Sequence, residues 1–202
     1  MSIEVKGLTK AYGKAYVFRD LTISFPDGVT TVIMGASGCG KTTLARILLG
    51  LETADAGGVT GMPDKTAVVF QEDRLCTDFS AYENITLVLD TKKMDRQALW
   101  ETVSREAAQV GITEAHLRQN VEELSGGMKR RIALLRAVLY DADCMILDEA
   151  FQGLDAETKQ RTIAYVKERT AGKTCIVITH NEDEAEQFDG TICMPFSNLP
   201  KS

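Results

Sequence analysis

The residues best suited to chemistry in this chain form a glycine-rich loop, Gly35-Ala36-Ser37-Gly38-Cys39-Gly40-Lys41-Thr42. Glycines let the backbone wrap closely around phosphate oxygens, and successive N–H groups at a helix start attract an anion. Lys41 supplies a mobile positive charge for β- and γ-phosphates, and the Thr42 hydroxyl is a suitable Mg²⁺ ligand. The loop fits the pattern G-x-x-x-x-G-K-[ST] and predicts a site for nucleotide phosphates.

The elements that must hold this loop are visible on either side of it. Val29–Met34 is apolar and β-branched and follows the turn signal Pro26-Asp27-Gly28, which predicts a buried strand. After the loop, apolar residues recur at helical spacing from Leu44 to Leu51. The sequence therefore predicts a strand, a phosphate loop and a helix in that order.

A second group of candidate residues lies at the end of the apolar run Cys144–Leu147. A buried strand here places Asp148 near a Mg²⁺ ion held by Thr42. Glu149 follows one residue later, where its carboxylate is placed to polarise a water molecule. The alternative interpretation is a strand that meets a solvated acidic turn.

Two further polar residues follow predicted buried strands. Gln71 follows Thr66–Phe70, and His180 follows Thr174–Thr179. Ligands of open α/β sheets bind beyond the carboxyl ends of the strands, where both residues can reach a nucleotide. Taken alone, Gln71 is not a specific sign of a nucleotide site, and His180 is equally well explained as a surface histidine.

Residues 72–138 are predicted to be helical. Ser80-Ala81-Tyr82-Glu83 is a capping box, Asp95 caps a second helix, and Thr113 starts a short helix that carries His116, interpreted as an incidental surface residue. Ser125-Gly126-Gly127 at the next helix start is a second candidate anion site, although alone it is a plain helix cap. Before this region, Ala56–Gly58 and Gly61–Asp64 are predicted to be loops.

Composition narrows the possible partners and location. The chain has 202 residues, 44% of them hydrophobic, and a net charge of −6, which does not favour nucleic acid. The basic cluster Lys129–Arg131 is interpreted as a solvated helix face. Five cysteines without a C-x-x-C pair are typical of reduced cytosolic thiols. No apolar run reaches the ~18 residues of a membrane span, and the N-terminus is charged, so we expect membrane contact only through a partner.

Together, these motifs resemble those of the ATP-binding cassette (ABC) ATPases. The resemblance rests on the order Tyr12, G-x-x-x-x-G-K-T, Gln71, L-S-G-G-M, D-E, G-L-D and His180, which spans nearly the whole chain. It implies ATP and Mg²⁺ as cofactors, with metal contacts from Thr42, Gln71 and Asp148. It also implies that Glu149 is the general base, with Gln71 and His180 beside it in catalysis. The implied nucleotide-binding residues are Tyr12 (stacked on adenine), Gly35, Ser37, Gly38, Cys39, Gly40, Lys41, Thr42, Thr43, Ser125, Gly126, Gly127 and Asp155.

The resemblance also implies a fold and an assembly. The fold is an α/β P-loop NTPase core, mostly parallel sheet flanked by helices, with an antiparallel β edge. The core is expected at about 1–71 and 139–202, with a helical subdomain at about 72–138. Two chains, or this chain and a homologous ATPase, would sandwich ATP head to tail, because each phosphate loop needs a partner's Ser125–Gly127.

Finer similarity points to the nitrate/sulfonate/taurine branch of bacterial importer ATPases. It rests on Gln71–Leu75 followed by Asn84-Ile85, and on Asp148–Asp155, where Ala150 replaces the usual proline. The implied partners are a membrane permease, docked in a groove around residues 72–84, and a separate solute-binding protein. The chain would then lie on the inner face of the cell membrane, without a C-terminal regulatory domain.

Two other functions remain open. The first is a soluble ABC ATPase that acts in cofactor assembly. The second is a non-hydrolysing regulatory module that binds ATP, although intact Glu149, Gln71 and His180 argue against it.

Overall fold

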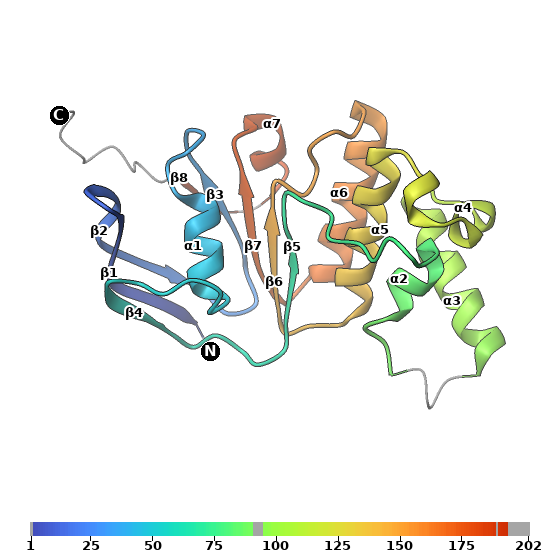
Figure 1. The fold of residues 1–202 in the computed structure, drawn as a ribbon, viewed down its shortest axis with the longest axis horizontal. Coiled ribbons are helices and arrows are strands. Elements are labelled where there is room, and N and C mark those ends of the chain that lie inside the picture. The colour runs from blue at the N-terminus through green and yellow to red at the C-terminus, as the bar shows by residue number, and fades with distance from the viewer. Residues whose placement is uncertain (1, 91–94, 189, 194–202) are drawn as a thin grey trace. The chain divides into compact units, whose positions relative to one another are not determined.

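The computed structural model of the chain describes residues 2–90, 95–188 and 190–193 (Figure 1). They belong to two compact units. The first, here called the sheet unit, is drawn from Met1–Val68, Asp143–Glu149 and Thr170–Ser202. The second, called the helical unit, is drawn from Val69–Ala142 and Ala150–Arg169. In the described part of the chain, no helix is long and apolar enough to cross a membrane.

The sheet unit contains a small antiparallel sheet with the strand order β2-β1-β4. Its strands are β1 (Ile3–Tyr12), β2 (Ala15–Phe25) and β4 (Ala56–Thr60). Apolar residues alternate with exposed ones along the end of β2, as expected of a strand buried on one face. The predicted antiparallel β edge is confirmed.

The prediction of a loop at Ala56–Gly58 is wrong, because these residues begin β4. Gly57 has a φ of 75°, and the pairing of β1 with β4 shifts register between Lys6 and Thr9. A Cβ on Gly57 would lie only 2.3 Å from the carbonyl oxygen of Gly7. Glycine here allows close approach of two strands at an irregularity, whereas a pair of glycines in a sequence suggests a loop.

A second, five-stranded sheet has the order β5-β6-β7-β3-β8, and the pairs β6–β7, β7–β3 and β3–β8 are parallel. Every residue of β6 and β7 is buried. Strands that are covered on both faces have continuous runs of apolar residues. This pattern is why β6 and β7 could be predicted from the sequence. Their bounds are β3 (Thr30–Met34), β5 (Thr66–Val69), β6 (Cys144–Asp148), β7 (Thr174–Thr179) and β8 (Thr191–Cys193). The sequence around Thr191–Met194 also predicts a short strand, and Met194 lies outside the described residues.

Two helices accompany the sheets, α1 (Lys41–Leu48) and α7 (Glu182–Ala185). Leu44 and Leu48 of α1 are buried in one cluster with Phe18, Ile33 and Ile146. Each fully buried side chain of this kind contributes roughly 1.5–3 kcal/mol relative to its exposed state. This core therefore fixes α1 and the loop that precedes it.

The four helix caps predicted for this unit, at Ser80, Asp95, Thr113 and Ser125, are all present. The Ser80 hydroxyl accepts a hydrogen bond from the Glu83 N–H, and Asp95 caps the third helix. His116, predicted to be incidental, completes a capping box: its Nδ1 accepts from the Thr113 N–H at 3.3 Å. The helices are α2 (Ala81–Thr86), α3 (Arg96–Gln109), α4 (Glu114–Arg118), the 3₁₀ helix η2 (Val121–Glu123), α5 (Gly126–Leu139) and α6 (Ala156–Thr170).

An ion pair between a buried glutamate and an exposed arginine joins two helices of this unit. Glu106 of α3 is 4% exposed, and its carboxylate contacts Arg169 of α6 at 2.6 Å and accepts a hydrogen bond from the Tyr165 hydroxyl at 3.0 Å. Burial and the neighbouring carboxylate raise the pKa of Tyr165 above its ordinary range. The phenol therefore stays protonated and donates its hydrogen bond.

Candidate nucleotide site

The phosphate loop joins β3 to α1 and is shaped by its glycines. Gly40 is the N-cap of α1 and has a φ of 100°. A Cβ on Gly40 would lie 2.3 Å from the Val17 Cγ1 and 2.9 Å from the Phe18 ring. Gly38 also has a positive φ of 77°. Glycine is thus required at Gly40 both for its conformation and because β2 packs against it.

Lys41 is 7% exposed and turns its ammonium back onto this loop. The Nζ donates to the carbonyl oxygens of Gly35 at 2.6 Å and Ala36 at 3.1 Å, and lies 4.0 Å from the Cys39 Sγ. A lysine ammonium has three donors and a flexible stem, so the same group can redirect its donors to phosphate oxygens.

The remaining predicted residues of the loop are accessible from solvent. Ser37 and Gly38 are exposed, Gly35 and Cys39 are partly exposed, and Thr42 is exposed on the first turn of α1 next to half-buried Thr43. Four backbone N–H groups at the start of a helix have no partner within it, so this end attracts an anion. The loop therefore offers donors to a ligand that approaches from solvent.

The parallel register brings the other chemical groups of the sheet unit to the same edge as this loop. Met34, which precedes the loop, pairs with Thr179 of β7, and Asp148 of β6 pairs with Ile178. Neighbouring strands are about 4.8 Å apart, so the ends of β3 and β6, which flank β7, are about 10 Å apart. Asp148, Glu149 and His180 thus emerge at the carboxyl ends of the strands, where ligands of such sheets bind.

Glu149 and His180 are in direct contact at this edge. The His180 Nδ1 lies 2.8 Å from the Glu149 Oε1, and the Glu149 side chain is 12% exposed whereas the His180 side chain is 54% exposed. Glu149 has a φ of 51°, and its N–H donates to the carbonyl oxygen of Ile178 at 2.9 Å. A left-handed conformation is costly for a residue with a side chain, so the surrounding strands must hold it in place.

The turn that carries His180 is fixed by side-chain hydrogen bonds. The Thr179 hydroxyl is buried, donates to the Glu184 Oε2 at 2.8 Å and accepts from the Asn181 N–H at 3.1 Å. Asn181 in turn caps α7 by accepting from the Glu184 N–H at 3.0 Å. Asn181 is thus the N-cap of α7, and together with Thr179 it fixes the turn in which His180 lies.

The oxygen donors at this edge fit a magnesium ion. The Thr42 hydroxyl and the fully buried Asp148 carboxylate are hard oxygen ligands of the type that Mg²⁺ prefers. Among the residues that the structure describes, no group of three histidine, cysteine or acidic side chains is placed to hold a metal. The pair of the Thr42 hydroxyl and the Asp148 carboxylate suits Mg²⁺, which is commonly held by one or two protein ligands together with phosphates and water.

Tyr12 lies at the end of β1 in the same unit. Its ring is 53% exposed, and the Lys10 Nζ lies 5.1 Å from the ring centroid. An exposed aromatic face is available for stacking on a base. The Lys10 ammonium is held by Glu52 at 2.7 Å and the Thr53 carbonyl at 2.8 Å, which keeps it beside the ring.

The other predicted residues belong to the helical unit. Ser125 caps α5 by accepting from the Met128 N–H at 3.3 Å, and Gly126 has open space around its Cα. A Cβ on Gly127 would lie 3.4 Å from the Leu154 side chain and 3.6 Å from the Gly153 carbonyl oxygen. The Ser125–Gly127 turn and the Gly153–Asp155 turn are therefore neighbours.

Asp155 caps α6, accepting from the Thr158 N–H at 3.0 Å. That hydrogen bond lowers the pKa of its carboxyl, so Asp155 is ionised at neutral pH. Gln71 is exposed, and its Nε2 lies 3.4 Å from the Gln152 Oε1. The structure thus groups Tyr12, the phosphate loop, Asp148, Glu149 and His180 in the sheet unit, and Gln71, Ser125–Gly127 and Asp155 in the helical unit.

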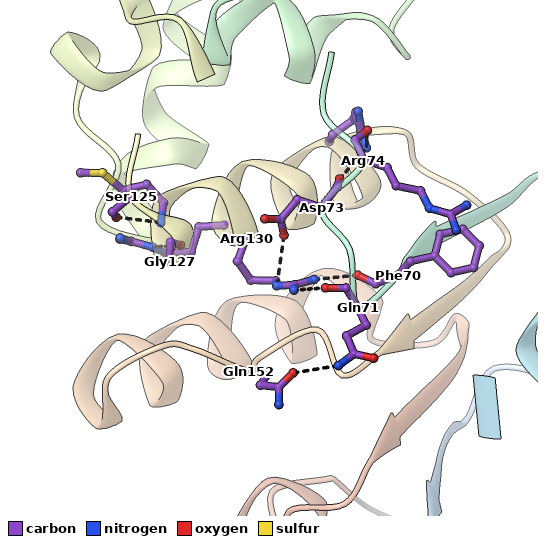
Figure 2. A network of polar contacts seen from close by, with 11 residues as sticks. Phe70, Gln71, Asp73, Arg74, Ser125, Gly127, Arg130 and Gln152 are labelled. Carbon is purple, nitrogen blue, oxygen red and sulfur yellow. Dashed lines mark hydrogen bonds and ion pairs between the residues drawn. The ribbon is translucent and has the colours of Figure 1, made fainter. Parts of the chain in front are cut away.

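The interpretation of Lys129–Arg131 as a solvated helix face is wrong for Arg130. This side chain is buried, and its guanidinium donates to the carbonyl oxygens of Phe70 and Gln71 (Figure 2). Arg131 is half-buried and donates to the carbonyls of Gly127 at 3.0 Å and Val110 at 2.8 Å. A run of three basic residues on a helix normally indicates a solvent-exposed helix face. Nothing in the run itself shows that Arg130 is the residue that is buried.

Comparison with known proteins shows which protein family this chain resembles. The model of the family described as "ABC transporter" matches residues 18–152. The taurine import ATP-binding protein TauB of Pseudomonas aeruginosa is 34% identical over 194 residues, covering 92% of this chain and 72% of TauB. The aliphatic sulfonates import ATP-binding protein SsuB 3 of Paraburkholderia xenovorans is 36% identical over 191 residues, covering 92% of this chain and 73% of that protein.

The spermidine/putrescine import ATP-binding protein PotA of Bacteroides fragilis is 34% identical over 202 residues and 94% of this chain. The chain spans less than half of that relative's length, 44%. Among solved structures, dimeric MJ0796, a bacterial ABC transporter cassette, superposes with a TM-score of 0.85 at 24% identity, covering 95% of this chain and 94% of the cassette.

The structural likeness confirms the predicted P-loop NTPase fold, and the matched relatives confirm the predicted importer-type resemblance, taurine and sulfonate proteins included. The family match covers more than half of the chain and contains the phosphate loop, Gln71, Ser125–Gly127 and the Asp148-Glu149 pair. The chain therefore belongs to the ABC transporter family.

Proposed function

We propose that this chain is the ATP-hydrolysing subunit of an ABC importer, and that ATP-driven dimerisation and hydrolysis drive a separate membrane permease. The observation that carries this proposal is the contact between Glu149 and His180 at 2.8 Å, directly after the buried Asp148 and at the same sheet edge as the phosphate loop. A carboxylate held by a second side chain at a phosphate site is the arrangement expected of a general base.

In the proposed bound state, the sheet unit holds the nucleotide. Tyr12 stacks on adenine, the backbone N–H groups of Gly38–Thr43 surround the phosphates, and Lys41 exchanges its loop carbonyls for phosphate oxygens. Thr42 and Asp148 would hold Mg²⁺, with Gln71 as a further proposed ligand. When bound, Mg²⁺ neutralises charge on the β- and γ-phosphates.

For hydrolysis, Glu149 accepts a proton from the attacking water as the water oxygen bonds to the γ-phosphorus. The bond from the γ-phosphorus to the bridging oxygen breaks at the same time, so ADP leaves and phosphate is formed. The contact with His180 fixes the Glu149 carboxylate and leaves the rest of the exposed imidazole ring available to the γ-phosphate. Gln71 orients the water and the metal. Positioning and charge stabilisation account for most of the catalysis in phosphoryl transfer, so these residues need fixed geometry more than covalent chemistry.

The active assembly is proposed to be a head-to-tail dimer, either of this chain or with a homologous ATPase. The adjacent turns Ser125–Gly127 and Gly153–Asp155 of the helical unit offer an accessible helix start with open space at Gly126. Each chain would present these turns to the γ-phosphate bound by its partner. Two composite sites then form, each completed by the other chain.

Coupling to transport is proposed to involve residues 72–138, acting as a helical subdomain. In and beside the expected docking segment 72–84, Phe79 is 37% exposed and Leu87 is 50% exposed. Large apolar side chains at a surface favour a protein partner, here a loop helix of the permease. The chain would thus work on the inner face of the cell membrane together with a solute-binding protein. The solute is recognised by those partners and not by this subunit.

Two alternatives make different predictions. A soluble ABC ATPase of cofactor assembly would hydrolyse ATP without any permease. A regulatory module would bind ATP and release no phosphate. The intact Glu149–His180 pair favours hydrolysis over the second alternative.

Isolation of the tagged chain from its native membranes tests the proposal. We expect a multi-span permease to co-purify, and we expect Phe79→Asp with Leu87→Asp to abolish this while soluble ATPase activity remains. Phosphate release with no membrane partner would favour the cofactor-assembly alternative, and nucleotide binding without phosphate release would favour the regulatory module.

A further inference from the structure

The segment that contains Gln71 is held by a buried arginine of α5. Arg130 donates through Nη1 to the Phe70 carbonyl oxygen at 2.6 Å and through Nη2 to the Gln71 carbonyl oxygen. Its Nε lies 3.2 Å from the Asp73 Oδ1, and the Arg130 side chain is only 9% exposed. Figure 2 shows this guanidinium reaching from α5 to Phe70, Gln71 and Asp73.

A second arginine of α5 extends the same clamp. The Arg136 Nη2 donates to the carbonyl oxygens of Asp73 at 3.4 Å and Arg74 at 3.1 Å. Arg74 has a φ of 45°, and its guanidinium stacks on the Phe70 ring at 3.9 Å. The backbone of residues 70–74 is irregular, and α5 donates hydrogen bonds to four of its five carbonyl groups, those of Phe70, Gln71, Asp73 and Arg74.

The contact of Arg130 with Phe70, Gln71 and Asp73 suits the shape of an arginine side chain. The guanidinium is a rigid planar fork that matches two successive carbonyl groups and one carboxylate, whereas a lysine ammonium is a point charge. Burial raises the pKa of Asp73, opposed first by Arg130. Removal of Arg130 would take from the half-buried Asp73 carboxylate its ion-pair partner at 3.2 Å and leave the charges of Lys129 and Arg136.

The same helix begins with the proposed γ-phosphate contact. Gly127 precedes Arg130 by three residues, about 4.5 Å along the axis and on a shared helix face. On the other side, the Gln71 amide contacts Gln152, which directly precedes Gly153, the neighbour of Gly127. Gln71 is therefore attached to the Ser125–Gly127 turn through its backbone, and to the Gly153–Asp155 turn through its side chain.

We infer that Arg130 is a positioning residue that locks the Gln71 segment to the start of α5, so that Gln71 and Ser125–Gly127 move as one body. This inference rests on the proposed function for its consequence in catalysis. A displacement of the docking segment next to Gln71 would then reach the helix start that faces the partner's γ-phosphate. Arg130 itself makes no contact with nucleotide in this scheme.

A double-mutant cycle between Arg130 and Gln71 provides the kinetic test. We expect Arg130→Lys to lower kcat about 10- to 100-fold, the scale of a misplacement of about 1 Å, with the KM for ATP within about twofold. In a Gln71→Ala background, Arg130→Lys should cause almost no further loss, because its effect passes through Gln71. Losses that multiply in the double variant would show that Arg130 acts elsewhere and would overturn the inference.

Hydrogen exchange tests the clamp without any ATPase activity. We expect faster amide exchange in Arg130→Lys within both the 70–76 and 125–129 segments, and no change in Arg105→Lys, whose side chain is 65% exposed on α3. Unchanged exchange in either segment would overturn the inference. A wild-type protein that released no phosphate would instead refute the proposed function, while the exchange measurement would still decide whether the clamp exists. Lysine retains the charge beside Asp73, which favours folding of the variant.

Discussion

The Nδ1 atom of His180 lies 2.8 Å from the Oε1 atom of Glu149, across the carboxyl ends of β7 and β6. Neither residue is free to adopt many positions. Glu149 is in a left-handed conformation with its N–H bonded to the Ile178 carbonyl oxygen, and His180 lies in a turn held by the Thr179 hydroxyl. The strained backbone at Glu149 thus serves to aim a carboxylate that the histidine then fixes.

The first prediction follows from that contact. His180→Ala should lower kcat by about 10²-fold, since it frees the Glu149 carboxylate to leave its position, while ATP binding changes little. Steady-state phosphate release at a series of ATP concentrations measures kcat and the KM for ATP. His116→Ala is the matched control: His116 is the other histidine of the chain, and it only caps α4. Equal losses in the two variants would show that His180 has no special role.

The second prediction concerns affinity for the nucleotide. Tyr12→Ala should weaken ATP binding by about 1–3 kcal/mol, the contribution of one base–aromatic stack, or roughly 5- to 150-fold in Kd. Lys41→Ala should weaken binding further and abolish hydrolysis, because the phosphates lose their main mobile countercharge. Titration with a fluorescent ATP analogue measures both variants. Tyr16→Ala is the control, since Tyr16 is also an exposed β-strand tyrosine, at 38%. Wild-type affinity in Tyr12→Ala would place the adenine elsewhere.

The strands around the site were predictable because each carries its own signal. Cys144–Asp148 and Thr174–Thr179 are apolar runs of strand length, and parallel strands buried on both faces have that pattern. The glycine-rich loop is equally local, since its function depends on consecutive backbone groups. Local structure that depends on neighbours in sequence, such as these strands and the loop before α1, could therefore be predicted from sequence.

Contacts between distant residues could not be predicted in this way. Arg130 lies in a run of basic residues that normally faces solvent, and its burial depends on carbonyl groups 59 and 60 residues away. Similarly, Asn84 is fully buried and binds the Cys76 N–H at 2.8 Å and the carbonyl oxygens of Cys76 and Ser80. The sequence offered Asn84 only as part of a family resemblance. Irregular backbone needs such partners, and their identity is set by the tertiary fold.

The third prediction concerns the reactivity of the cysteines. Cys39 is partly exposed in the phosphate loop and Cys76 is exposed, so both should react with iodoacetamide in the native protein. Cys144 and Cys175 are buried, which raises their pKa values to about 11 and about 12, so neither should react. Mg-ATP should protect Cys39 and leave Cys76 reactive. Peptide mass spectrometry measures each site. Equal labelling of Cys39 with and without Mg-ATP would contradict the location of the phosphates.

The fourth prediction is a change in stability at alkaline pH. Burial raises the pKa of Cys175 from 9.0 to about 12. Above pH 9 the unfolded thiol loses its proton and the folded thiol keeps it, so the unfolded state binds fewer protons and stability falls as pH rises. Cys175→Ala should reduce this slope by up to about 1.4 kcal/mol per pH unit between pH 9 and 10.5. Urea unfolding at each pH measures the slope, and Cys76→Ala, at an exposed thiol, should leave it unchanged.

The fifth prediction tests the general base and the composite site in one protein. Glutamine at position 149 keeps the size of the side chain but cannot accept a proton, so Glu149→Gln should slow hydrolysis by about 10²- to 10⁴-fold. Lys41, Thr42 and Asp148 are unchanged, so ATP should still bind. Uncleaved ATP would then hold two chains together, each phosphate loop facing the partner's Ser125–Gly127. We expect Glu149→Gln to elute as a dimer with Mg-ATP and as a monomer with Mg-ADP, at high protein concentration because isolated subunits associate weakly.

Gly127→Asp in the Glu149→Gln background distinguishes this dimer from nonspecific association. A Cβ at Gly127 is tolerated at 3.4 Å from Leu154, so the added carboxylate should not unfold α5. It would face the partner's γ-phosphate in an interface poor in water, where two like charges repel strongly. The double variant should therefore be monomeric with Mg-ATP. A double variant that still dimerised would refute the composite site, and full turnover by Glu149→Gln would remove Glu149 from the mechanism.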